Sequence, residues 1–106
     1  MVSNKDGVKR LKELSKELMD TIEKKNSDYS DDKDFFFNFK TCEYFLDIDP
    51  LTGILIRMGD KYSRVCKIRD SNPKVKNESL KDALLDLAGY ALISALYIEP
   101  ETKKKN

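Results

Sequence analysis

Apolar and polar positions recur at helical spacing along most of the chain. In its first quarter, apolar residues return every three or four positions among lysines and glutamates, and they are Val8, Leu11, Leu14, Leu18, Met19 and Ile22. This period is typical of an amphipathic helix, which we expect over residues 8–25 with Asn4 or Asp6 as a cap. Residues 26–34 are rich in polar residues that favour turns, so they predict a loop.

The middle of the chain predicts two further helices. The aromatic run FFFNFKTCEYFL at residues 35–46 is too continuous for a clean period, so we expect a helix that is buried on most sides. Pro50 and Gly53 are then expected to interrupt the helix, because both residue types disfavour helix interiors. The next helix, from residue 52 or 53 to 69, separates an apolar from a charged side. The apolar side holds Leu55, Met58, Tyr62, Val65 and Cys66, and the charged side holds Arg57, Asp60, Lys61 and Arg64.

The last predicted helix begins at Glu78 and ends near residue 98, because Pro100 cannot continue it. Ser79 and Asp82 fit a capping box, and acids in a first turn interact favourably with the helix dipole. No strand pattern occurs. The sequence therefore predicts an all-α fold, a small bundle of about four helices that forms a single domain over residues 1–99, with a disordered basic tail over 100–106.

Composition narrows the possible functions. The chain has 106 residues and a net charge of +1, so no overall field favours DNA, RNA or an anionic membrane. It contains no histidine, which excludes histidine-based acid–base catalysis and histidine-ligated metals. Cys42 and Cys66 lack the spacing of a zinc or redox motif, so we expect reduced core thiols in a cytoplasmic protein. The N-terminus has no apolar signal-peptide core, and the most apolar stretch, 84–98, is too short to span a bilayer.

Three acids on the last predicted helix are the candidate chemistry. Glu78, Asp82 and Asp86 follow one another at intervals of four residues, and the helix start explains only the first two. We expect Asp86 to be partly buried and paired with a cation from the charged side of the preceding helix. Two interpretations stay open. The charges either fix the helix register as a salt-bridge network, or they hold magnesium and phosphate oxygens. Gly89 favours the second, because a helical glycine leaves room for a close approach.

Three segments carry a resemblance to a known family. They are DYS at 28–30, GILIRMGDKYSR at 53–64 and ESLKDALLDLAGYALI at 78–93. Their order and spacing resemble the type 1 nucleotide modification-associated domain family over about residues 22–98. This resemblance implies a role in phage or bacterial nucleotide metabolism or modification, inside the bacterial host cell. The family is more distantly similar to the MazG-like all-α nucleoside triphosphate pyrophosphohydrolases, whose acidic motifs bind magnesium.

By position, the resemblance implies a site. It implies ligand contacts from Asp28 and Tyr29 in a loop and from Lys61, Arg64 and Tyr90 on the two last helices. The magnesium ligands that it implies are Asp60, Glu78, Asp82 and Asp86. The segment 82–86 is similar to the second MazG acidic motif. The first motif, two glutamates three residues apart, has no clear counterpart, and Ser30 stands where the family usually has glycine.

The sequence thus predicts binding of a nucleotide or cyclic nucleotide, with magnesium, at a charged site between helices of a homo-oligomer. In the enzyme version, a metal-bound water attacks the phosphates. The alternative is a non-catalytic module that sequesters a nucleotide signal or binds another protein, with its charged residues forming a structural salt-bridge network. For the aromatic run at residues 35–39, a core or dimer face is favoured over a base pocket.

Overall fold

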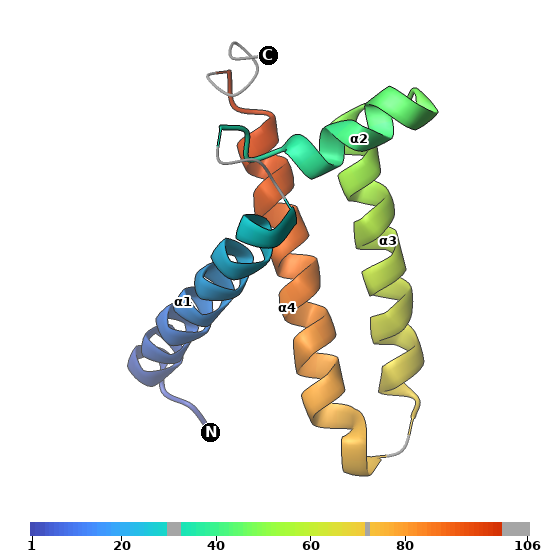
Figure 1. Cartoon of the computed structure of the whole chain (residues 1–106). Helices are drawn as coiled ribbons and strands as arrows, with labels where there is room; N and C mark the ends of the chain where they lie inside the picture. Colours follow the sequence, from blue (N-terminus) through green and yellow to red (C-terminus); the bar gives the residue numbers. More distant parts are fainter. Residues whose placement is uncertain (30–32, 72, 101–106) are drawn as a thin grey trace. The chain divides into compact units, whose positions relative to one another are not determined.

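The described residues of the protein form four helices (Figure 1). The computed structural model describes residues 1–29, 33–71 and 73–100, and within these ranges it leaves out the side chains of residues 28, 29, 42 and 73–76. The helices are α1 (Asn4–Tyr29), α2 (Phe37–Leu46), α3 (Pro50–Arg69) and α4 (Pro73–Tyr97). The predicted all-α fold with four helices is confirmed, and the described ranges contain no strand.

The chain divides into two compact units, Met1–Phe35 and Phe36–Asn106. The prediction of a single domain over 1–99 stays a prediction, and residues 101–106 of the predicted tail lie outside the described residues. No described helix is both long and apolar enough to cross a membrane.

The first unit contains α1, which extends beyond its predicted bounds. At its start, Ser3 Oγ accepts a hydrogen bond from the Asp6 backbone N–H at 3.1 Å, so Ser3 caps the helix in place of Asn4 or Asp6. At its end, the loop predicted over residues 26–34 is wrong for residues 26–29, which are helical, and residues 30–32 lie outside the described residues. Ser27 Oγ donates to the Lys24 carbonyl at 2.8 Å, and this local bond lets a turn-favouring residue stay helical.

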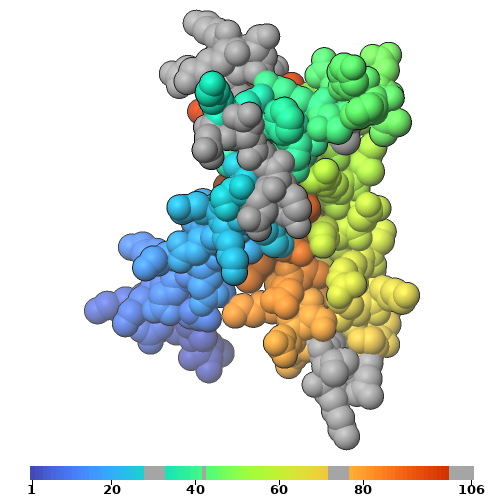
Figure 2. Space-filling view, viewed as in Figure 1, coloured from blue at the N-terminus to red at the C-terminus, as the bar shows by residue number. Residues whose placement is uncertain are grey.

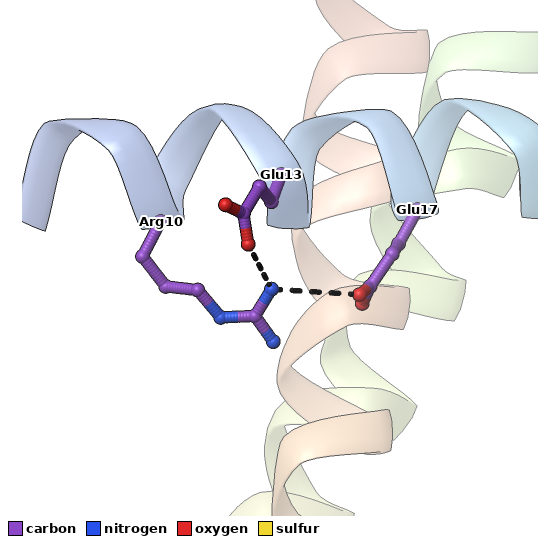
Figure 3. A network of polar contacts seen from close by, with 3 residues as sticks. All are labelled: Arg10, Glu13 and Glu17. Atoms are coloured by element: carbon purple, nitrogen blue, oxygen red, sulfur yellow. Dashed lines mark hydrogen bonds and ion pairs between the residues drawn. The ribbon is translucent and has the colours of Figure 1, made fainter.

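A charged side of α1 is held together within the helix itself (Figure 3). Arg10 Nη1 lies 3.0 Å from Glu13 Oε2 and 3.6 Å from Glu17 Oε1. All three side chains are about half exposed, so each contact stabilises the helix by only a few tenths of a kcal/mol.

The second unit is organised around α3 and α4, which run antiparallel side by side, with α2 across one end (Figure 1). Buried or half-buried residues on α3 alternate at intervals of four and three, which is a heptad seam. These residues are Ile54, Met58, Lys61, Val65 and Ile68. A matching seam on α4 holds Ala83, Asp86, Tyr90, Ile93 and Tyr97. Ser94 Oγ donates to Met58 Sδ at 3.9 Å, which is a direct contact between the two helices.

The predicted faces of α3 are partly wrong. Leu55 and Tyr62, expected on the apolar side, are exposed, whereas Lys61, expected on the charged side, is half-buried. Ile54 is instead completely buried. The helix is therefore turned by about one residue relative to the prediction, because the seam formed by Ile54 and its heptad partners is the one that α4 covers.

The start of α3 shows why Pro50 does not break the chain. Pro50 is the first residue of the helix, where its missing N–H costs nothing. Asp49 is the cap, since its carboxylate accepts from the Thr52 backbone N–H at 3.0 Å and from Thr52 Oγ1 at 2.7 Å. Gly53 continues the helix by donating to the Asp49 carbonyl at 3.1 Å. The predicted interruption is thus limited to the turn after Leu46, where Asp47 takes a left-handed conformation with φ 54°.

The start of α4 corrects the interpretation of its acids. The helix begins at Pro73, five residues before the predicted start at Glu78. Ser79 and Asp82 therefore do not form a capping box at a helix terminus, and no acid lies in the first turn. The helix dipole does not explain Glu78, because its effect fades beyond the first turn.

The Asp49 cap of α3 is expected to make the stability of the protein depend on pH. Hydrogen bonds from the Thr52 side chain and backbone lower the pKa of Asp49 below its ordinary value of 3.8. Because the folded pKa lies below the unfolded one, the cap's stabilisation is fully present above the unfolded value and is lost as the pH falls through the folded value. We expect Asp49→Ala to lower the Tm at neutral pH. On acidification, the Tm of this variant should fall by less than the Tm of the wild type. Asp49→Asn, which can still cap, should keep the neutral-pH Tm but lose the acid dependence, and identical acid profiles for all three proteins would contradict this account.

Candidate functional site

The central polar feature of the second unit is an ion pair between α3 and α4. Lys61 Nζ lies 3.1 Å from Asp86 Oδ2, and the two side chains are only 32% and 28% exposed. Both residues occupy seam positions of their helices. The prediction that Asp86 is partly buried and paired with a cation of the preceding helix is confirmed, with Lys61 as the cation.

The surroundings of this pair are mostly apolar. Its seam neighbours on α3 are Met58 and Val65, and on α4 the buried Ala83 precedes Asp86 by one turn. A single charge in such a position would lose hydration without compensation, whereas two opposite charges compensate one another. Among the described residues, no buried side-chain nitrogen or oxygen lacks a hydrogen-bond partner. The seam therefore holds a matched pair of charges.

The other predicted site residues of the second unit lie around this pair. Asp60 and Arg64 on α3 and Glu78 and Asp82 on α4 are exposed, and Tyr90 on α4 is half-buried. Within the described part of the chain, Arg64 and Asp82 form no ion pair. Asp28 and Tyr29 lie on α1 in the other unit, and their side chains are outside the described residues. The structure thus joins Lys61 to Asp86 and leaves the remaining acids of this unit in solvent.

The predicted magnesium ligands do not form a ready group. Within the described ranges, which include all four predicted acids, no three acidic or thiol side chains come close enough to hold a metal ion. A hard cation needs several oxygen ligands at one point, and Asp86 already pairs with Lys61. The described residues therefore do not fit a magnesium ion, and magnesium binding stays a prediction.

The sequence interpretation missed a contact between α2 and α3. The guanidinium of Arg57 lies 4.8 Å from the centre of the Phe39 ring, which is a cation–π geometry. Phe39 is buried, as is Phe36, whose ring meets Tyr97 edge-on at 5.1 Å. Burial, with Glu43 and Asp49 nearby, raises the pKa of Tyr97. The aromatic run contained the signal for this contact, but only the crossing of α2 over the other helices selects which of its rings are inside.

The outer side of α2 corrects the prediction of a helix buried on most sides. Phe37, Tyr44, Phe45 and Leu46 are exposed by 53%, 83%, 72% and 65%. The rings of Tyr44 and Phe45 meet edge-on with their centres 4.9 Å apart. An open groove of about 590 Å³ lies along this side. The residues that line the groove are Phe37, Lys40, Thr41, Glu43, Tyr44 and Phe45, which we call the α2 patch. In Figure 2, α2 (green) presents a protruding surface at one end of this unit.

A second apolar surface follows α4. Its members are spaced by four residues, all are exposed, and they are Leu84, Ala88, Leu92 and Leu96. The seam side and this stripe together make α4 apolar on most of its circumference, which is typical of a helix that is covered on more than one side. Gly89, which the sequence associates with close approach, is buried.

Comparisons with known proteins assign neither a family nor a function to the chain. No family model matches the chain, and neither the curated proteins nor the solved structures include a match to it. The resemblance to the nucleotide modification-associated family therefore stays a prediction from the three quoted segments.

Substitution of Asp86 tests the role of the ion pair. We expect Asp86→Asn to destabilise the fold by about 1–2 kcal/mol, between the small value of exposed pairs and the larger cost of breaking a fully buried one. The reason is that Lys61 keeps its charge in a half-buried seam without a partner. Chemical denaturation monitored by circular dichroism measures the change.

Two controls sharpen this test. Glu78→Gln removes an exposed acid from the same helix and should leave stability within about 0.5 kcal/mol of the wild type. The double variant Lys61→Met, Asp86→Leu removes both charges and should recover most of the stability lost by Asp86→Asn. A double variant as unstable as the single one would show that the charges are not the cause.

Proposed function

We propose that this chain is a protein-binding helical module that acts through the α2 patch. The observation that carries the proposal is the exposure of three large aromatic side chains, Phe37, Tyr44 and Phe45, on one helix of ten residues. Together they expose roughly 400 Å² of mainly apolar surface, taking about 150–250 Å² for a whole aromatic side chain. Apolar patches of this size on soluble proteins commonly mark interaction sites.

The buried side of α2 supports the same proposal. Phe36 and Phe39 anchor the helix by their buried rings, and Arg57 covers the face of Phe39. The rings that anchor α2 are thus different from the exposed rings of the patch, Phe37, Tyr44 and Phe45. An aromatic surface on an anchored helix loses little conformational entropy when a partner covers it, because the rings have few rotatable bonds.

The Lys61–Asp86 pair has a structural part in this proposal. A polar pair at one point of an apolar heptad seam favours the single register that brings the two charges together. The register of α3 against α4 determines where the N-terminal end of α3 lies, and α2 packs there through Arg57. The pair thus supports the position of α2 without contacting the protein that α2 binds.

A second proposal retains the nucleotide ligand, and one observation favours it. Arg57, Lys61 and Arg64 follow one another along one side of α3 at intervals of about one turn, and Arg64 is exposed. Guanidinium and ammonium groups are strong partners of phosphate oxygens. In this proposal a phosphate pairs with Arg64 and competes with Asp86 for Lys61, and Tyr90 lies one turn beyond Asp86 on α4.

Photo-crosslinking tests the protein-binding proposal. A benzophenone amino acid in place of Tyr44, irradiated in cells that produce the chain, should give one adduct of discrete mass, because a specific partner covers this ring. The same probe at Tyr62, an exposed aromatic position on α3, should not give that adduct. The absence of any discrete adduct at position 44, or equal adducts at both positions, would contradict the proposal.

Ligand screening tests the nucleotide proposal separately. Nucleoside mono-, di- and triphosphates and cyclic dinucleotides, each with and without magnesium, should include one that raises the Tm of the wild type. Arg64→Ala should lower its affinity about tenfold, the loss of roughly 1.4 kcal/mol expected for one charged contact. Lys9→Ala, an exposed lysine on α1, is the matched control and should have no effect. If no nucleotide shifts the Tm or is converted, this second proposal fails.

A further inference from the structure

The charge pattern of the α2 patch becomes its own complement when the helix is reversed. Lys40 and Glu43 both line the groove, three residues apart and on the same flank of the aromatic rings. The midpoint between these two residues falls between positions 41 and 42. This point is also the middle of α2, which runs from Phe37 to Leu46. Reversal of the helix about its centre therefore places a cation where an anion was.

From this symmetry we infer that the partner of the α2 patch is a second copy of this chain, whose α2 lies antiparallel across the first. The inference rests on the proposed function, since it names the protein that the patch binds. A two-fold axis that passes between the two helices, level with the middle of each α2, brings Lys40 of each copy opposite Glu43 of the other. One axis thus forms two equivalent ion pairs, as closed two-fold interfaces require.

The apolar surface fits the same arrangement. With the axis at the centre, the ten-residue helices overlap over their whole length of about 15 Å. The aromatic side chains of two copies, with the polar rim around them, can bury roughly 1,000 Å² in total, the lower size limit of specific interfaces. We therefore expect a weak dimer, with a dissociation constant of about micromolar order.

Charge and apolar area have different roles in this interface. Burial of the rings supplies most of the affinity, whereas the rim pairs select the partner, because like charges placed opposite one another disfavour a complex. An unrelated protein would need its own matching pattern of charges. A lipid surface presents no ordered pattern of charges that complements a cation and an anion side by side. A second copy already carries the complementary pattern.

Charge reversal in the purified chain tests the inference. Sedimentation equilibrium should give twice the chain mass for the wild type at high concentration. Lys40→Glu puts two acids opposite each other, and Glu43→Lys puts two lysines opposite each other. Each should weaken dimerisation at least tenfold. The double variant Lys40→Glu, Glu43→Lys restores both pairs and should dimerise again.

A mixture of the two single variants gives the sharpest outcome. One variant then carries only acids at these positions and the other only lysines, so the mixture should form a heterodimer although neither variant pairs with itself. Circular dichroism of each variant checks the fold, and Tyr44→Glu should abolish dimerisation without any change at Lys40 or Glu43. A wild type that stays monomeric, or a mixture and double variant that both stay monomeric, overturns the inference.

The two proposals fail in different ways. If the wild type is monomeric and the probe at position 44 still gives an adduct of another mass, the α2 patch binds a different protein and only self-pairing is wrong. If the probe gives no discrete adduct and the chain is monomeric, protein binding through α2 is wrong as well. If the probe gives an adduct of twice the chain mass and the mixture dimerises, both hold.

Discussion

One ion pair lies inside the apolar seam of the second unit and favours a single alignment of its two long helices. Lys61 and Asp86 lie 3.1 Å apart where two helices pack through residues spaced by three and four. Apolar contacts alone would tolerate a shift of one helix along the other by a turn, because similar side chains would meet again. Such a shift would leave both charges unpaired and half-buried. We infer that the pair favours one alignment, which fixes where the α3 residues that contact α2 lie relative to α4.

This arrangement divides the apolar residues between an interior and an outer surface. Ile54, Ala83 and the rings of Phe36 and Phe39 are buried, while the aromatic residues of the α2 patch are exposed. A short helix that crosses the end of a helix pair can bury only one of its sides. The aromatic residues on its other side are available to a partner, which connects a feature of the packing to the proposed binding role.

Particular residues show how far the sequence led. The helical periods predicted the all-α fold, and the position of Asp86 beyond a first turn predicted its pairing with a cation. The bounds of three helices were less accurate for local reasons: Ser27 stays helical through a bond to the Lys24 carbonyl, Pro50 begins α3 under the cap of Asp49, and Pro73 begins α4. Prolines at first helical positions resemble helix breakers when only the sequence is read.

The sequence by itself determined that the chain forms four helices and that Asp86 needs a cation, because both follow from local spacing and from the cost of burying a charge. Only the tertiary structure decided which cation it is, which side of α3 faces α4 and which aromatic residues of α2 are outside. These outcomes depend on the rotation and crossing of helices, which arise from contacts between residues far apart in the sequence. For the same reason, the spacing of the acids did not reveal that they fail to converge on one point.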